Sequence, residues 1–98
     1  MKISFQNRDL KSVIERIKEN IPPDFVKSLE ITSDPDFVYI TLKKMGTSTF
    51  RYRWKNENSH LSWELDQEKL AFTHRQYYDK ILGKIRSIIK RVDGVIEA

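Results

Sequence analysis

The fold is decided by residues 37–65, which read FVYITLKKMGTSTFRYRWKNENSHLSWEL. Within this stretch, large apolar or aromatic side chains alternate with polar ones in three runs, at residues 37–44, 49–55 and 60–65. Alternation with a period of two predicts strands that bury one face and expose the other. Only short polar or glycine-containing segments separate the runs, which predicts consecutive antiparallel strands.

Two more alternating segments precede this stretch. Residues 27–33 predict a fourth strand, and Asp34-Pro35-Asp36 predicts the turn that joins it to residue 37. Residues 1–5 also alternate and are compatible with a short edge strand. The chain from residue 27 to residue 65 is therefore expected to form a four-stranded antiparallel meander.

Helical spacing of apolar residues appears on both sides of the meander. It begins at residue 10 and ends at Pro22-Pro23, with Asn7 as the expected N-cap. Asp66 is the expected N-cap of a longer helix over residues 67–92, and Gly94 the residue that ends it. The predicted order is β-α-β-β-β-β-α. The predicted class is α+β, with two layers and both helices on one face of the sheet.

Size and composition indicate one small packed domain. The chain has 98 residues, of which 39% are hydrophobic and 33% charged, and none is cysteine. A single domain over residues 1–98 is the expectation for this length. The lack of cysteine excludes disulfides and thiolate zinc sites, and it favours a reducing, cytoplasmic location. No long apolar run follows Met1, so neither a signal peptide nor contact with a membrane is predicted.

Positive charge is sorted along the chain. The net charge is +4, from 18 Lys and Arg against 14 Asp and Glu. Residues 37–56 hold five of the bases and no acid, and residues 69–92 hold seven bases against one acid, Asp79. Charge concentrated in this way creates a field that a polyanion such as nucleic acid would sense. Solubility alone is the other explanation, and the sequence leaves both open.

Ten residues in these two segments are candidates for contact with nucleic acid. In the strands, cations alternate with aromatic residues, a pairing that single-strand binders use to hold phosphates and stack bases. In the long helix, the cations lie on two flanks that bracket the apolar stripe. The candidates are Tyr39, Lys43, Arg51, Arg53, Lys55, Lys80, Lys84, Arg86, Lys90 and Arg91.

The apolar stripe of the long helix is the candidate protein interface. A helix over residues 67–92 would be about 39 Å long, whereas strands of seven residues span about 23 Å. The overhanging end would leave apolar side chains bare, so we expect either an oblique crossing, a bend at Gly83, or a homodimer. The predicted interface consists of Ile81, Ile85, Ile88, Ile89 and Val92.

No motif names a reaction. The two histidines, His60 and His74, are far apart in sequence, and no glycine-rich loop or nucleophile motif is present, so no catalytic residue, metal site or cofactor is predicted. Nothing points to a small-molecule ligand. The leading hypothesis is a small non-catalytic nucleic-acid-binding protein that forms a homodimer; RNA binding is expected, and the sequence does not distinguish RNA from DNA. A protein-interaction or assembly subunit that uses the apolar stripe is the alternative, and a small RNase is the third.

Overall fold

The computed structural model describes residues 1–97 and contains a six-stranded antiparallel sheet with two α-helices. The strands lie in the order β2-β3-β4-β5-β1-β6, so the two ends of the chain pair with each other beyond the central meander. The elements are β1 (Lys2–Gln6), α1 (Leu10–Glu19), β2 (Leu29–Ser33), β3 (Phe37–Lys43), β4 (Thr47–Glu57), β5 (His60–Lys69), a 3₁₀ helix η1 (Phe72–Tyr77), α2 (Tyr78–Arg91) and β6 (Val95–Glu97).

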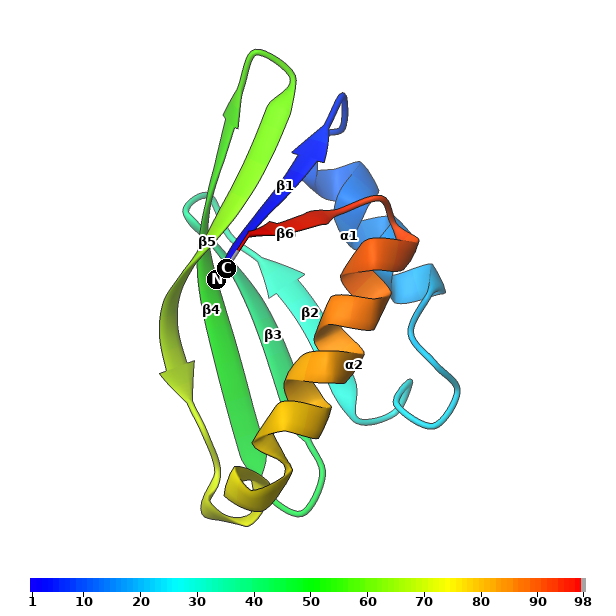
Figure 1. The fold of residues 1–98 in the computed structure, drawn as a ribbon, viewed down its shortest axis with the longest axis vertical. Helices are drawn as coiled ribbons and strands as arrows, with labels where there is room; N and C mark the ends of the chain where they lie inside the picture. Colours follow the sequence, from blue (N-terminus) through cyan, green and yellow to red (C-terminus); the bar gives the residue numbers. More distant parts are fainter. Residues whose placement is uncertain (98) are drawn as a thin grey trace.

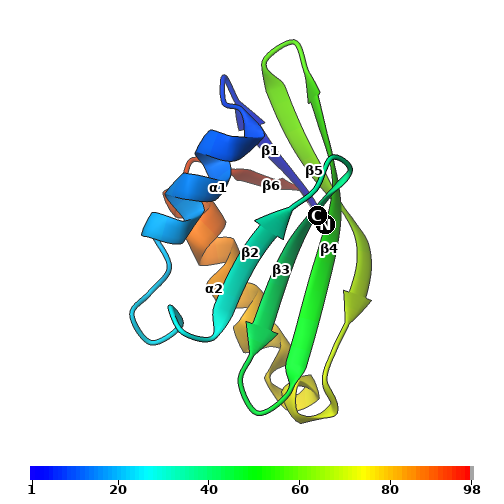
Figure 2. The same ribbon diagram turned by 180° about the vertical axis from the view of Figure 1, so that it is seen from behind.

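Both α-helices pack on one face of the sheet, and the other face is open to solvent (Figure 1, Figure 2). Alternation explains which side chains enter the core: Val38, Ile40 and Leu42 of β3 are buried, while their neighbours on the strand face outward. The predicted α+β class with helices on one face is therefore confirmed, and the predicted four-stranded meander is part of a larger sheet of six strands.

The N-terminal strand lies inside the sheet and not at its edge. β1 pairs with β5 on one side, where Ile3 lies opposite Trp63, and with β6 on the other. Its buried residues include Ile3 and Phe5, whose ring lies 5.1 Å from that of Trp63. β6 was not predicted, because three residues are too few to show alternation.

The prediction of one helix over residues 67–92 is wrong at its start. Residues 66–69 continue β5, and residues 67–69 pair with β4, where Glu68 lies opposite Phe50 and Lys69 opposite Thr49. Asp66 is not an N-cap: it is the extra residue at the β-bulge between β4 and β5, because Arg51 pairs with Gln67 and Tyr52 with Leu65. Backbone hydrogen bonds to the long neighbouring strand override the helical propensity of this polar segment.

The caps of the two helices also differ from the prediction. Asp9, not Asn7, caps α1, and its carboxylate accepts a 2.7 Å hydrogen bond from the Ser12 backbone N–H. This bond lowers the pKa of Asp9 below its usual value. At the end of α2, Asp93 takes the left-handed conformation, with φ of 65°.

Gly94 follows Asp93 and allows the chain to pass closely over the helix end. Its N–H donates to the Ile89 carbonyl at 2.9 Å, and the Asp93 N–H donates to the Lys90 carbonyl at 3.2 Å, which together make a Schellman cap. A Cβ atom at Gly94 would collide with Ile89 and would lie 2.8 Å from Cε1 of Phe5. The small residue thus lets the chain turn directly from α2 into β6.

Candidate nucleic-acid interface

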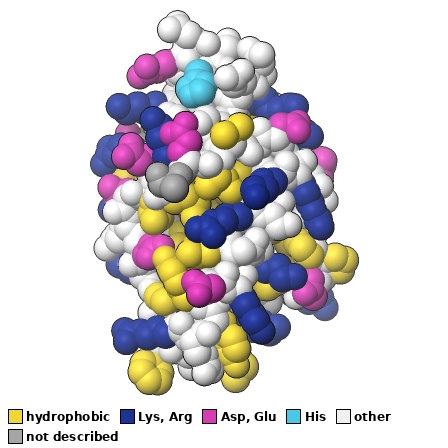
Figure 3. All heavy atoms as spheres, in the orientation of Figure 1, with side chains coloured by type: hydrophobic (Ala, Val, Ile, Leu, Met, Phe, Trp, Pro, Cys, Tyr) yellow, Lys and Arg dark blue, Asp and Glu magenta, His cyan; other side chains and the backbone are white. Residues whose placement is uncertain are grey.

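The exposed face of α2 is strongly basic. Its inward side chains, among them Ile85 and Ile89, are buried against the sheet, so every charged residue of the helix faces solvent. That face carries five cations and one acid, Asp79. In the view of Figure 3, Lys and Arg side chains follow the helix from one end to the other. The cations are Lys80, Lys84, Arg86, Lys90 and Arg91.

The sequence analysis predicted two rows of cations on α2, one on each side of the apolar stripe. On the solvent side of the helix, small residues lie between these two rows. Gly83 and Ser87 lie between the flanks on the solvent side, and the space where a Gly83 side chain would stand is open. With Arg86, Lys90 and Arg91 they line a shallow hollow of about 520 Å³. Arg86, Lys90 and Arg91 therefore share one surface across these small residues, and we call the exposed side of the helix that carries them together with Lys80 and Lys84 the α2 face.

Among residues 1–97, no cation of the α2 face forms an ion pair with a carboxylate. The four ion pairs in this part of the chain involve Arg8, Arg16, Lys43 and Arg51. Lys84 instead lies over the ring of Phe25, with its Nζ atom 5.6 Å from the ring centroid. The cations of the α2 face are thus not paired directly with carboxylates of the described chain.

The open face of the sheet carries the other five candidates, and acids lie among them. Lys43 pairs with Glu30 at 3.1 Å, and Nε of Arg51 donates a 2.8 Å hydrogen bond to Asp66. These carboxylates neutralise positive charge that would otherwise attract the phosphates of a nucleic acid. Of the five candidates, Tyr39, Lys43, Arg51, Arg53 and Lys55, the cations without an ion pair among residues 1–97 are Arg53 and Lys55.

The aromatic side chains of the sheet face are also engaged within the protein. The guanidinium carbons of Arg51 and Arg53 lie 4.5 Å and 4.8 Å from the centroid of the Phe37 ring. The hydroxyl of Tyr39 donates a 2.8 Å hydrogen bond to Asp34. A base could stack on Phe37 only after displacing the two guanidinium groups.

Hydrogen bonds around Asp34 fix this corner of the sheet face. The carboxylate of Asp34 accepts from the Asp36 N–H, the Tyr39 hydroxyl and the Phe37 N–H, and these bonds lower its pKa. The same bond to Asp34 raises the pKa of Tyr39, because the hydroxyl proton is held by a carboxylate. The polar groups at this corner of the sheet are therefore hydrogen-bonded to one another within the protein.

The two groups of candidate residues lie on opposite sides of the molecule. The sheet-face residues point away from the helices, whereas the α2 face points away from the sheet. Arg51 and Lys84 therefore do not converge into one electropositive area. Any phosphate contact made by one group is independent of contact made by the other.

The predicted apolar interface is part of the chain's own core. Ile81, the most exposed of its five residues, is 7% accessible, and Val92 is 0% accessible. The overhang that motivated a homodimer is absent, because α2 has 14 residues and is about 21 Å long, which matches the sheet beneath it. The five residues predicted to form the interface are covered within the single chain, where they belong to one core cluster with sheet and α1 side chains. They are Ile81, Ile85, Ile88, Ile89 and Val92. Homodimerisation stays a prediction without this support.

His74 is a packed residue with both ring nitrogens engaged. Its Nε2 lies 2.6 Å from the Lys44 carbonyl, which can only accept, so the ring proton is on Nε2. Its Nδ1 shares a hydrogen bond of 2.5 Å with the Ser48 hydroxyl, and the Ser48 oxygen accepts from the Ala71 N–H at 2.9 Å. His60 lies far from this network, at the start of β5 opposite Gln6 and Glu57.

A second hollow lies beside the N-terminal end of α2, and the sequence did not predict it. It has a volume of about 790 Å³ and is bounded by the β3–β4 turn, the segment around Phe25, η1 and the first turns of α2. Three strongly exposed apolar residues line it: Met45 is 83% accessible, Phe72 82% and Tyr77 49%. Phe72 and Tyr77 fall outside the heptad spacing of the predicted helix, but no sequence pattern relates them to Met45.

Neither a metal-binding cluster nor a membrane-spanning helix occurs among residues 1–97. No group of three or more His, Asp or Glu side chains is arranged to hold a metal ion in that range. Nor does any helix there have the length and apolar character needed to cross a membrane. No family model, curated protein or solved structure matches the chain.

Proposed function

We propose that the protein is a non-catalytic nucleic-acid-binding protein that holds phosphates with the α2 face. The observation that carries the proposal is the set of five cations on one exposed helix face, against one acid and without ion pairs among residues 1–97. Side chains kept only for solubility are usually interspersed with acids, whereas phosphate-binding surfaces concentrate cations. The sheet face is left out of the proposal, because acids occupy it.

The dimensions of the α2 face suit a run of backbone phosphates. Lys80 and Arg91 are 11 residues apart, which is about 16 Å along a helix axis. Phosphates on one strand of a duplex rise by about 3.4 Å per nucleotide, so several fall within this length. Gly83 and Ser87 keep the middle of the surface low, so that a sugar-phosphate chain can approach the helix between the longer cations.

The direct test is the salt dependence of binding. If all five cations neutralise a phosphate of duplex DNA, the logarithm of the affinity should fall with the logarithm of salt concentration with a slope of about −4.5. Fluorescence anisotropy with labelled single-stranded RNA, single-stranded DNA and duplex DNA, at about 50 and about 200 mM salt, measures it. Absence of binding to all three at the lower salt concentration would refute the proposal.

A pair of matched variants separates this surface from total charge. Arg86→Glu with Lys90→Glu reverses two cations of the α2 face. Arg53→Glu with Lys55→Glu makes the same change in net charge on the open face of the sheet. We expect the first double variant to lose most of the affinity and the second to retain most of it. An equal loss in both would show that only net charge matters.

Catalysis remains the weakest alternative. A small RNase needs a histidine or carboxylate with a free proton-accepting atom near the phosphate. His74 has both ring nitrogens engaged inside the protein and does not lie on the α2 face. The same binding assay, followed by gel analysis of the RNA, separates binding from cleavage.

A further inference from the structure

The hollow beside the start of α2, which we call the 72–84 pocket, is built mainly from apolar side chains. Leu42 and Ile81 come from the core, and Phe25, Met45 and Tyr77 come from the surrounding segments. Its volume of about 790 Å³ lies in the range of small-molecule sites, about 300–1,000 Å³. Three of the five exposed large apolar side chains in residues 1–97 line this one place. Such a concentration of exposed apolar surface indicates a binding function.

The wall of the pocket is held in shape by polar contacts beneath it. His74 is 5% accessible and bonds to the Lys44 carbonyl and the Ser48 hydroxyl, so it links η1 to the β3–β4 turn and to β4. The Thr73 hydroxyl donates to the Met45 carbonyl. Gly46 between these residues has φ of 131°, and a Cβ there would lie 2.6 Å from the Thr73 hydroxyl oxygen. The turn and η1 therefore form a pre-organised wall, which lowers the cost of binding.

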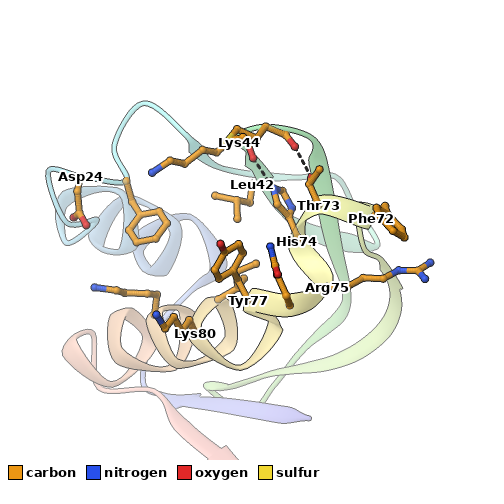
Figure 4. Close-up of a pocket in the computed structure, with 14 residues that line it drawn as sticks. Asp24, Leu42, Lys44, Phe72, Thr73, His74, Arg75, Tyr77 and Lys80 are labelled. Atoms are coloured by element: carbon orange, nitrogen blue, oxygen red, sulfur yellow. Dashed lines mark hydrogen bonds between the residues drawn. The ribbon is translucent and has the colours of Figure 1, made fainter.

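Cations surround the pocket. Figure 4 shows Lys44 and Lys80 on opposite sides of it, with Leu42 and Tyr77 between them. Lys84 is a third cation at this edge, where its ammonium lies over the ring of Phe25. Arg75 points away from the pocket and lies over Phe72, 5.6 Å from the ring centroid.

The acids do not balance this charge. Asp24 is the one carboxylate among the residues that line the pocket in the described part of the chain. None of the three lysines forms an ion pair within residues 1–97. An apolar interior with an unneutralised cationic edge fits a ligand that has an apolar body and an anionic end.

We propose that the 72–84 pocket binds a small amphipathic carboxylate. The aliphatic or aromatic body packs on Leu42, Tyr77 and Ile81, and the carboxylate lies at the cationic edge, where Lys44, Lys80 and Lys84 supply the positive charge and the nearest ammonium group pairs with it. The site shares Lys80 and Lys84 with the α2 face, but the proposal does not depend on nucleic-acid binding, because the apolar interior and Lys44 lie outside that face.

Three probes of the same chain length test the proposal: octanoate, octanol and octylammonium. Amide chemical shifts are followed by ¹⁵N-correlated NMR of the full chain below micelle-forming concentrations. We expect saturable shifts for octanoate at Lys44, His74, Tyr77 and Lys84, a lower affinity for octanol, and the weakest for octylammonium. Equal affinity for all three probes, shifts elsewhere in the protein, or no saturation would overturn the proposal.

Charge-reversal variants locate the anionic end. Each exposed ion pair contributes up to about 1 kcal/mol, so Lys44→Glu and Lys80→Glu should each weaken octanoate binding by up to about fivefold and leave octanol binding unchanged. Lys90→Glu is the matched control, because Lys90 lies on the α2 face outside the pocket. Loss of octanoate binding in Lys90→Glu, or none in the other two, would contradict the assignment. Saturable binding of an acidic apolar peptide with no octanoate binding would identify a protein-docking surface instead and would also overturn it.

Discussion

On the open face of the sheet, Nε of Arg51 donates a 2.8 Å hydrogen bond to Oδ2 of Asp66. Arg51 lies on β4, and Asp66 is the extra residue of the bulge in β5. The bulge directs the carboxylate toward the guanidinium group, so one irregularity of the sheet removes a cation from the surface available to ligands. With the Lys43–Glu30 pair, this contact leaves Arg53 and Lys55 as the candidate cations of the sheet face without an ion pair among residues 1–97.

We therefore predict that Arg51→Ala changes affinity for nucleic acid by less than about twofold, because its charge is already paired. The variant should lose a modest amount of stability, about 0.2–1 kcal/mol, as expected for a partly exposed ion pair. Anisotropy titration and urea unfolding measure the two effects. A loss of affinity as large as that of Arg86→Ala would show that the sheet face is part of the nucleic-acid-binding site.

The two glycines of the C-terminal region should respond in opposite ways to alanine. Gly94→Ala places a Cβ against Ile89 and Phe5, and we expect a loss of about 1–3 kcal/mol in the free energy of unfolding. Gly83→Ala meets open space within a helix and should stabilise the protein by up to about 1 kcal/mol. Urea unfolding of both variants provides the comparison, and a stabilising Gly94→Ala would show that the close approach is wrong.

His74→Ala should destabilise the protein and loosen the 72–84 pocket. The substitution leaves the Lys44 carbonyl and the Ser48 hydroxyl without their partner, and an unsatisfied buried group costs about 1–3 kcal/mol. Hydrogen exchange should speed up at η1 and in the β3–β4 turn and change little in β1. His60→Ala is the matched control, since His60 is exposed, and it should leave the stability within about 0.5 kcal/mol.

Stability should fall at alkaline pH because of Tyr52. Burial raises the pKa of Tyr52 to about 12, whereas in the unfolded chain the phenol ionises near 10. The unfolded state therefore loses its proton first, and the stabilisation is complete below about pH 10 and is lost between about pH 10 and about pH 12. The expected slope is about 1.4 kcal/mol per pH unit for this group.

Urea unfolding at several pH values checks the alkaline decline, and Tyr52→Phe should remove the part that belongs to Tyr52. Tyr78 adds a smaller effect of the same sign, because its hydroxyl donates to Glu68 and this bond raises its pKa to about 12. An unchanged decline in Tyr52→Phe would assign it to other groups.

Alternation and helical spacing were sufficient to predict the parts of the fold with large buried side chains. The meander and α1 were expected because residues such as Val38 and Ile40 leave a clear period of two or of 3.6. Residues 66–69 are all polar and show no such period, so only pairing with β4 reveals that they are a strand. β6 likewise depends on β1, a partner more than 90 residues away.

The residues of the α2 face could be predicted from the sequence, whereas those of the 72–84 pocket could not. The five cations of the α2 face were all candidates, because exposure on a helix follows from the positions of the buried residues. The 72–84 pocket could not be predicted, since it exists only where the β3–β4 turn meets η1. Met45 and Phe72 are 27 positions apart in the chain and carry no shared pattern.

The position of β1 has a consequence for how the polypeptide reaches its final shape. Its neighbours, residues 60–64 and 95–97, leave the ribosome long after it does. Until then its backbone groups on both edges lack their strand partners, and Phe5 lacks the ring of Trp63 against which it packs. Closing such distant contacts is slow, so β1 is the strand of residues 1–97 that waits longest for its partners during synthesis and is exposed to aggregation over that time.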